Sequence, residues 1–431
     1  MDRFSTYILQ PGFRMHVLPT DKFKTVRMKM FWRWPLSAQS ATSVALLPMV
    51  LRRGCASLPS SREIAVHMES MYGASFATDI TKIGETQLIE WDLEVADNNY
   101  LPEVPDLLRA GLHFIRQLAL EPLLENNAFK SSYVSTEKDN LRHRIEGLFN
   151  DKPRYALTRL FSVMCSEEPF AIPRYGRLED IEKITPDSLY SQYENLRDQA
   201  PIDIYIVGNV SPESIQTMVN EVFANTSRHL IQIPAIKQKP VNSVRHNEEA
   251  QDIKQANLAI GLRSQIGFAS DDYPALMVYN GVLGAFPHSK LFVNVREKHS
   301  LAYFASSRLE STKRLQYILA GIDSSKYEEA LSLIQAQLDD TRAGRFSDTD
   351  LSAAQKSIVN GLRSSQDNAG YVIDAHMIGL INNRERQPDE LINAVKAVTA
   401  DDVVRAARQV QLDTVFLLRS TSGKGGASSA K

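Results

Sequence analysis

The chain has 431 residues, of which 43% are hydrophobic and 23% are charged, a composition typical of globular rather than disordered proteins. Its formal net charge of −2 gives no electrostatic basis for binding nucleic acid. The two cysteines, Cys55 and Cys165, are too few for a disulfide framework, and no stretch has the apolar length of a signal peptide or a membrane span. We therefore expect a cytoplasmic protein with roughly two to four domains.

The first half of the chain alternates patterns typical of strands and helices. Alternating apolar residues across 14–34 predict two strands joined by a turn at Pro19-Thr20-Asp21. Helices are predicted at 43–54, which ends at Gly54, and at 60–73, where Ser60 or Ser61 is the N-cap. The later predicted elements are strands at 75–83 and 86–95, long helices at 100–119 and 123–149, a shorter helix from 185, and a strand at 202–210.

The second half repeats this order. The predicted elements are a strand at 257–266, helices at 274–284 and 289–299, strands at 301–310 and 315–323, helices at 326–344, 347–365 and 399–410, and a strand at 413–420. Because the elements agree in type and order, the sequence predicts two homologous units. Strands that come in adjacent pairs favour antiparallel pairing. The expected fold class is therefore α+β, each unit being a mostly antiparallel sheet with helices packed on one face.

Composition indicates where the units end. Residues 229–250 contain prolines, mixed charge and little periodicity, which is typical of an extended linker. We predict an N-terminal domain at 1–228, this linker, a C-terminal domain at 251–421 and a flexible tail at 422–431.

The sequence contains no complete motif for independent catalysis. No two of the nine histidines lie at i, i+4, the spacing that places two imidazoles on one helix face for zinc. His143 and His246 each begin a His-x-x-Glu stretch without a second histidine, so each is better explained by a solvated charged surface. No Gly-x-Ser-x-Gly or Walker loop is present, although a triad assembled from distant residues stays open. We therefore predict no metal site in this chain.

One stretch, SKLFVNVREKHSLAYFASS at residues 289–307, combines two patterns. It begins as a helix, breaks at His299-Ser300 and continues as a strand, with Arg296 and Tyr303 on either side of the break. With almost no loop between helix and strand, both side chains can project into one cleft.

The corresponding place in the first unit has Glu69 and Ala77, so the two copies differ where a function could lie. The alternative is structural. Arg296 would then pair with a carboxylate such as Glu297 or Glu310, and Tyr303 would cover the edge of a core.

This stretch resembles the signature of the M16 (pitrilysin, or inverzincin) peptidases, in which such a helix closes the second homologous domain. The matching residues are Ser289, Leu291, Phe292, Val295, Arg296, Glu297, Lys298, Leu301, Ala302 and Tyr303. The two-unit layout, the long helices and the Gly-Asn-Val at 208–210 are also similar to that family, so the resemblance covers nearly the whole chain. The resemblance implies that the two units form one half of a clam-shell. In the short members of the family, a second chain forms the other half. The chain also looks like a bacterial group linked to elongation factor P modification, but no residue supports aminoalkyl-transfer chemistry.

In that family a His-x-x-Glu-His motif on the first helix binds zinc, and a further glutamate lies near the end of the long helix. Aligning Gly54 places Ala45 and Met49 at the two histidines and Pro48 at the glutamate, and the third ligand falls near Arg144. None of these side chains can bind Zn²⁺, and none can take the proton from a zinc-bound water. The resemblance therefore implies a chain that is inactive alone and holds no metal.

Heterodimeric members divide the work, because one chain carries zinc and the other supplies an arginine and a tyrosine. The resemblance implies that Arg296 and Tyr303 are catalytic residues that bind and polarise a peptide beside the zinc of a homologous His-x-x-Glu-His partner. The substrate is expected to be a peptide, with leader peptides among the candidates. It is predicted to contact a reduced glycine-rich loop through Gly281, Gly284 and Ser289. Two alternatives stay open, namely an inert scaffold derived from a peptidase and an independent metallopeptidase with other ligands.

Overall fold

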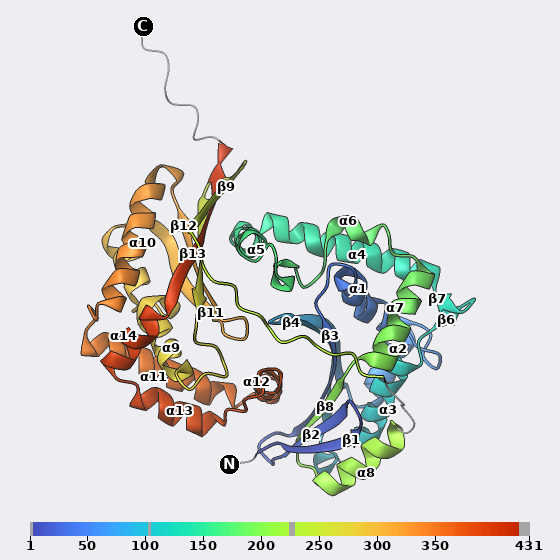
Figure 1. Cartoon of the computed structure of the whole chain (residues 1–431). Helices are drawn as coiled ribbons and strands as arrows, with labels where there is room; N and C mark the ends of the chain where they lie inside the picture. The colour runs from blue at the N-terminus through green and yellow to red at the C-terminus, as the bar shows by residue number, and fades with distance from the viewer. Residues whose placement is uncertain (1–2, 102–104, 224–228, 422–431) are drawn as a thin grey trace. The chain divides into compact units, whose positions relative to one another are not determined.

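A computed structural model describes residues 3–101, 105–223 and 229–421, so the predicted tail at 422–431 lies outside the described residues. Contacts divide the chain into two compact units. The first unit comprises residues 1–146, 172–235 and 369–374, and the second comprises residues 147–171, 236–368 and 375–431. Each unit contains one large sheet with helices against it, which confirms the predicted fold class (Figure 1). Among the described residues, every helix is too short or too polar to span a membrane.

The first unit is built on a six-stranded sheet with the strand order β1-β2-β8-β3-β5-β4. The strands are β1 (Ser5–Gln10), β2 (Phe13–Pro19), β3 (Thr25–Pro35), β4 (Ser75–Ile83), β5 (Thr86–Ala96) and β8 (Ile202–Gly208). β2 and β8 pair in parallel, and the other neighbouring pairs are antiparallel. The predicted strands at 75–83 and 86–95 are therefore confirmed as β4 and β5.

Helices cover the apolar face of this sheet. Met28, Met30 and Trp32 alternate along β3 and are fully buried on that face. α3 approaches the sheet closely, since a Cβ added to Gly111 would lie 2.5 Å from Met28 Cε. The elements of this layer are α1 (Ala41–Leu51), α2 (Ser61–Ser70), the short helix η1 (Asn98–Tyr100), α3 (Leu107–Leu120), the hairpin β6 (Leu124–Glu125) and β7 (Ala128–Phe129), α4 (Ser131–Asn150), α6 (Leu178–Ile181), α7 (Pro186–Gln199) and α8 (Pro212–Val222).

The opposite face of the first sheet carries a buried charge cluster around Asp203 on β8. The Asp203 carboxylate lies 2.8 Å from Arg14 Nε, 3.0 Å from His16 Nε2 and 2.8 Å from Arg33 Nε. Burial by itself raises the pKa of Asp203. The hydrogen bond to His16 and the charges of Arg33 and Arg14 outweigh that effect and lower the pKa to about 2.

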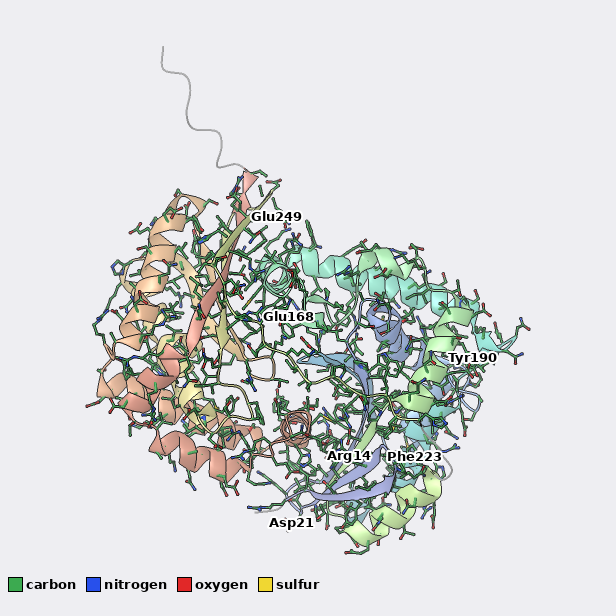
Figure 2. All side chains as sticks on the ribbon, in the orientation of Figure 1. Arg14, Asp21, Glu168, Tyr190, Phe223 and Glu249 are labelled. Atoms are coloured by element: carbon green, nitrogen blue, oxygen red, sulfur yellow. The ribbon has the colours of Figure 1, made fainter. Side chains whose placement is uncertain are left out.

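This cluster makes stability depend on pH below about 4. The folded-state pKa of Asp203 is lower than the ordinary 3.8, so ionised Asp203 stabilises the fold above pH 3.8, and that contribution is lost as the pH falls towards about 2. We expect Asp203→Asn to lower the free energy of unfolding at pH 7 by about 2 kcal/mol and to flatten its dependence on pH between about 4 and 2. Urea unfolding followed by circular dichroism measures both, with Asp21→Asn at the exposed turn as the control (Figure 2). Equal pH profiles for the two variants would contradict the expectation.

The second unit is built on a five-stranded sheet with the order β11-β12-β10-β13-β9. The strands are β9 (Arg245–Gln251), β10 (Ala256–Ser264), β11 (Ala302–Glu310), β12 (Leu315–Ile322) and β13 (Val410–Ser420). β9 and β13 pair in parallel and the others are antiparallel, so the order and the directions repeat those of β4-β5-β3-β8-β2. The topology thus agrees with the predicted duplication. β9 falls partly in the stretch expected to be a linker, because its alternating polar residues gave no apolar pattern.

One face of the second sheet packs against most of the unit's helices. Leu258, Ile260 and Leu262 of β10 belong to this core. The elements around it are α9 (Tyr273–Asn280), the π-helical segments η3 (Gly281–Ala285) and η4 (Leu291–Lys298), the short helix η5 (Ser324–Lys326), α10 (Tyr327–Arg342), α11 (Asp348–Ser365), α13 (Pro388–Ala397) and α14 (Ala400–Arg408). α12 (Ala369–Ile381) contributes residues to both units.

The other face of the second sheet is covered by α5 (Lys152–Met164), which the sequence analysis did not predict. Ala156 and Leu160 of α5 pack with Ala259 of β10, which points away from the main core. Figure 1 shows α5 beside the strands of this sheet. Tyr155 Oη donates to Glu249 of β9 at 2.7 Å (Figure 2). Helices therefore lie on both faces of this sheet, so the prediction of helices on one face only was wrong for the second unit. A helix from the N-terminal half of the chain belongs to this unit.

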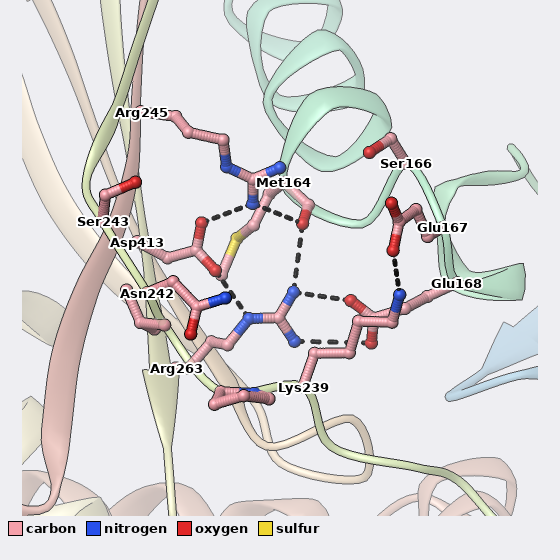
Figure 3. A pocket seen from close by; sticks show the side chains of 12 residues that line it. Met164, Ser166, Glu167, Glu168, Lys239, Asn242, Ser243, Arg245, Arg263 and Asp413 are labelled. Carbon is pink, nitrogen blue, oxygen red and sulfur yellow. Dashed lines mark hydrogen bonds and ion pairs between the residues drawn. The ribbon is translucent and has the colours of Figure 1, made fainter.

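A buried ionic network fixes the end of α5 beside the short helix η2 (Pro169–Ala171). Arg263 of β10 binds Asp413 Oδ2 at 2.6 Å and Glu168 Oε1 at 2.5 Å, and it also donates to the carbonyl of Met164 at 3.0 Å (Figure 3). Arg245 binds Asp413 and the last carbonyls of the helix. These residues line a pocket of about 230 Å³. Two arginines at a helix C-terminus complement its negative dipole end.

Candidate functional site

The corner predicted at 289–307 exists and is tight. η4 ends at Lys298, and only His299, Ser300 and Leu301 precede β11. Ser300 has a positive φ of 50°, and the Leu301 amide donates to the Val295 carbonyl at 2.9 Å. These features turn the chain from helix to strand without a longer loop. η4 itself is π-helical, a rare conformation that is frequent at functional sites.

Arg296 lies in the last turn of η4 and is exposed. Its guanidinium carbon lies 4.5 Å from the centroid of the Phe292 ring. Within the described part of the chain, Arg296 makes no hydrogen bond or ion pair, so the alternative pairing with Glu297 or Glu310 does not occur there. Its in-plane N–H donors therefore remain available to a ligand.

Tyr303 lies on the other side of the corner, at the start of the edge strand β11, and it is 70% exposed. The pairing of β11 with β12 shifts register between Ala302 and Phe304, so Tyr303 sits at a β-irregularity. Such irregularities redirect a side chain. Tyr303 does not cover the edge of a core, because most of its surface faces solvent. The corner thus presents a permanent cation and a phenolic donor on packed neighbouring elements.

The three residues predicted to contact substrate lie beneath this corner rather than on its surface. Gly281 and Gly284 are buried in η3. A Cβ on Gly281 would lie 2.9 Å from Ala354 Cβ of α11, and one on Gly284 would lie 2.7 Å from Ser307 Oγ of β11. Ser289 is also buried. Close packing accounts for both glycines, and their contact with substrate stays a prediction.

A buried polar network under β11 was not anticipated from the sequence. Ser307 Oγ donates to Asn280 Oδ1 at 2.6 Å, and Gln316 Nε2 donates to the same oxygen at 3.0 Å. The three residues lie on β11, α9 and β12, so the network joins a helix to both strands. Hydrogen bonds between buried polar groups hold the surrounding elements in one arrangement. Their scattered positions in the sequence give no pattern that could reveal the network.

The positions that the resemblance aligns with the zinc motif lie in the first unit. Ala45, Pro48 and Met49 are buried in α1, and Thr78 Oγ1 of β4 donates to the carbonyl of Pro48 at 3.2 Å. Arg144 is exposed and lies 3.3 Å from Asp79.

No cluster of metal-binding side chains replaces that motif in what the structure describes. Within residues 3–101, 105–223 and 229–421, no three His, Cys, Asp or Glu side chains are placed to hold a metal ion. Glu137, which is fully buried on α4, is bound by Arg53 and by Asn140. That carboxylate therefore has partners within the first unit.

Comparisons with known proteins agree with the two-unit fold, and they include relatives described as inactive peptidases. Residues 183–358 match the family described as the peptidase M16 inactive domain. A probable inactive metalloprotease, YmfF of Bacillus subtilis, is 35% identical over 96% of this chain and 97% of its own length. AlbE of Bacillus subtilis, named an antilisterial bacteriocin subtilosin biosynthesis protein, is 24% identical over 64% of this chain and 69% of its own length. The crystal structure of a conserved protein from Enterococcus faecalis V583 superposes with a TM-score of 0.91 at 26% identity, covering 97% of this chain and 99% of that one. The chain therefore belongs to the M16 peptidase family, as a homologue of its inactive members.

Proposed function

We propose that this chain is the non-catalytic subunit of a heterodimeric M16 zinc metallopeptidase and that it supplies Arg296 and Tyr303 to the peptide substrate. The observation that supports the proposal is an exposed, unpaired guanidinium on η4 and an exposed phenol on β11, on either side of one tight corner between two packed elements. Among the described residues Arg296 has no carboxylate partner, although Glu297 directly follows it in the chain. Tyr303 is 70% exposed, so its hydroxyl is accessible to a ligand.

The two side chains suit a reaction in which negative charge develops on a carbonyl oxygen. The guanidinium keeps its charge at any physiological pH and offers several N–H donors, and the Tyr303 hydroxyl offers one more. Each such donor aimed at a developing oxyanion contributes about 3–4 kcal/mol to lowering the barrier. A zinc ion in the partner subunit would supply the activated water. Ala45, Pro48 and Met49 of this chain cannot bind such an ion.

The substrate class follows from the family and from one relative. M16 proteins are peptidases, and AlbE carries a name that refers to the biosynthesis of a bacteriocin. We therefore propose peptides as substrates, including leader segments of ribosomally made peptides. The proposed partner is a homologous M16 subunit that has the His-x-x-Glu-His motif.

Co-purification tests the proposal. The full-length tagged chain, isolated from its native cells, should bring with it an M16 homologue that has His-x-x-Glu-His, with about one zinc per pair. A quenched fluorescent peptide of mixed sequence should be cleaved by both chains together and by neither alone. Cleavage by this chain alone with stoichiometric zinc, or the absence of any M16 partner, would overturn the proposal. Cleavage by the partner alone at the full rate would leave this chain as an inert scaffold.

A further inference from the structure

We propose that Phe292 is a positioning residue that holds the Arg296 guanidinium ready for the substrate, an inference that rests on the proposed function. Phe292 lies one turn before Arg296 in η4, and the distance from its ring centroid to the guanidinium carbon is 4.5 Å. That distance is within the range in which a cation is attracted to the face of an aromatic ring.

An aromatic ring suits the positioning of Arg296 better than a carboxylate does. A carboxylate partner would occupy the in-plane N–H donors of Arg296, and those donors could then no longer bind a substrate carbonyl. A ring against the guanidinium restricts the rotamers of the arginine and, unlike a carboxylate, does not occupy its N–H donors with strong hydrogen bonds. Phe292 therefore orders the cation without consuming its hydrogen-bonding capacity.

The platform itself is well anchored. Leu291 and Val295 are fully buried on either side of Phe292 in the chain, and they hold η4 to the core of the second unit. Asn294 adds a hydrogen bond to Gln337 of α10 at 2.5 Å. The half-buried Phe292 thus projects from a fixed segment, and the long, flexible arginine side chain gains order from it.

The main test uses Phe292→Leu in the full-length chain assembled with its zinc-bearing partner. With the quenched fluorescent peptide as substrate, we expect kcat to fall about two- to fivefold, the effect of losing one exposed cation–π contact. Phe292→Trp should keep the wild-type kcat. In an Arg296→Ala background, Phe292→Leu should have no further effect, because there is no guanidinium left to position. Independent, multiplying effects of the two substitutions would overturn the proposal.

A control and a second measurement separate this inference from the proposed function. Phe149 is the matched control, because it also lies under a cation, Lys152, at 3.9 Å, and Phe149→Leu should leave turnover unchanged. In the isolated chain, the Arg296 side-chain Nε–H resonance, identified by its loss in Arg296→Lys, should show a ring-current shift. Phe292→Leu should abolish that shift and Phe292→Trp should retain it. If Arg296→Ala leaves turnover intact, the proposed function fails, whereas a ring-current shift that survives Phe292→Leu overturns only the role of Phe292.

Discussion

Arg296→Ala should lower the kcat of the assembled pair by about 10²–10³-fold, the usual loss when one donor to a developing oxyanion is removed. Zinc content and assembly should not change, because Arg296 is exposed and makes no ion pair or hydrogen bond with the described residues. Steady-state cleavage of the quenched peptide measures kcat, and gel filtration with metal analysis measures the rest. Tyr303→Phe, which removes only the hydroxyl, should cause a loss of similar kind.

The control for this experiment is Arg308→Ala. Arg308 is also exposed and lies on β11 after Tyr303, so it tests whether any nearby positive charge would serve. Its substitution should change kcat less than twofold if the effect is specific to the corner. Unchanged turnover in both Arg296→Ala and Tyr303→Phe would contradict the proposed function and favour a scaffold.

Arg263→Met should destabilise the second unit by about 3–5 kcal/mol, the usual cost of removing one member of a buried ionic network. The side chains of Arg263, Glu168 and Asp413 are only 6%, 5% and 3% exposed. Methionine fills a similar volume but removes the cation shared by the two carboxylates, which leaves Glu168 with Lys313 at 2.6 Å and Asp413 with Arg245 at 2.6 Å. Urea unfolding measured by circular dichroism should show the loss, and limited proteolysis should show earlier cleavage near α5.

A surface pair provides the comparison for this prediction. Arg419 lies 3.4 Å from Glu248, whose side chain is 62% exposed. Arg419→Met should cost less than about 1 kcal/mol, because solvent screens such a pair. If Arg263→Met and Arg419→Met destabilised the protein equally, the network would not have the stabilising role inferred from its burial.

Local patterns in the sequence were sufficient to predict much of the fold. Alternating apolar residues located β4, β5, β10 and β12, and Ser60 is the N-cap of α2, as the capping signal indicated. The predicted helix at 123–149 was wrong in its first residues, where Asn126 and Asn127 adopt positive φ and form a small hairpin. Turn chemistry overrides helical periodicity at such positions.

Two elements were not predicted. α5 was missed although its sequence has helix signals, since Asp151 is its N-cap, a proline lies in its first turn, and the buried Ala156, Leu160 and Met164 recur every four residues. Only its packing on the second sheet depends on residues far along the chain. β9 has alternating polar and charged residues, and only its pairing with β13 identifies it as a strand. Long-range pairing of this kind leaves no local pattern.

The candidate site was predictable only in part. The Arg296 and Tyr303 stretch could be recognised from residue types and spacing, but the exposure of both side chains requires the folded chain. The roles of Gly281 and Gly284 in packing depend on Ala354 and Ser307, which are remote in the sequence. The contact between Phe292 and the Arg296 guanidinium depends on how η4 winds, which periodicity alone does not specify.

The placement of α5 has a consequence for the gene. Residues 147–171 interrupt the first unit and complete the second, so neither unit is encoded by one uninterrupted stretch of DNA. A plasmid that carries only codons 236–431 would yield a sheet with the apolar surface of Ala259, Phe416 and Leu418 bare. Recombination at the midpoint of the gene would separate the codons of α5 from those of the sheet that it covers, so the hybrid would pair the second unit with a helix from another parent.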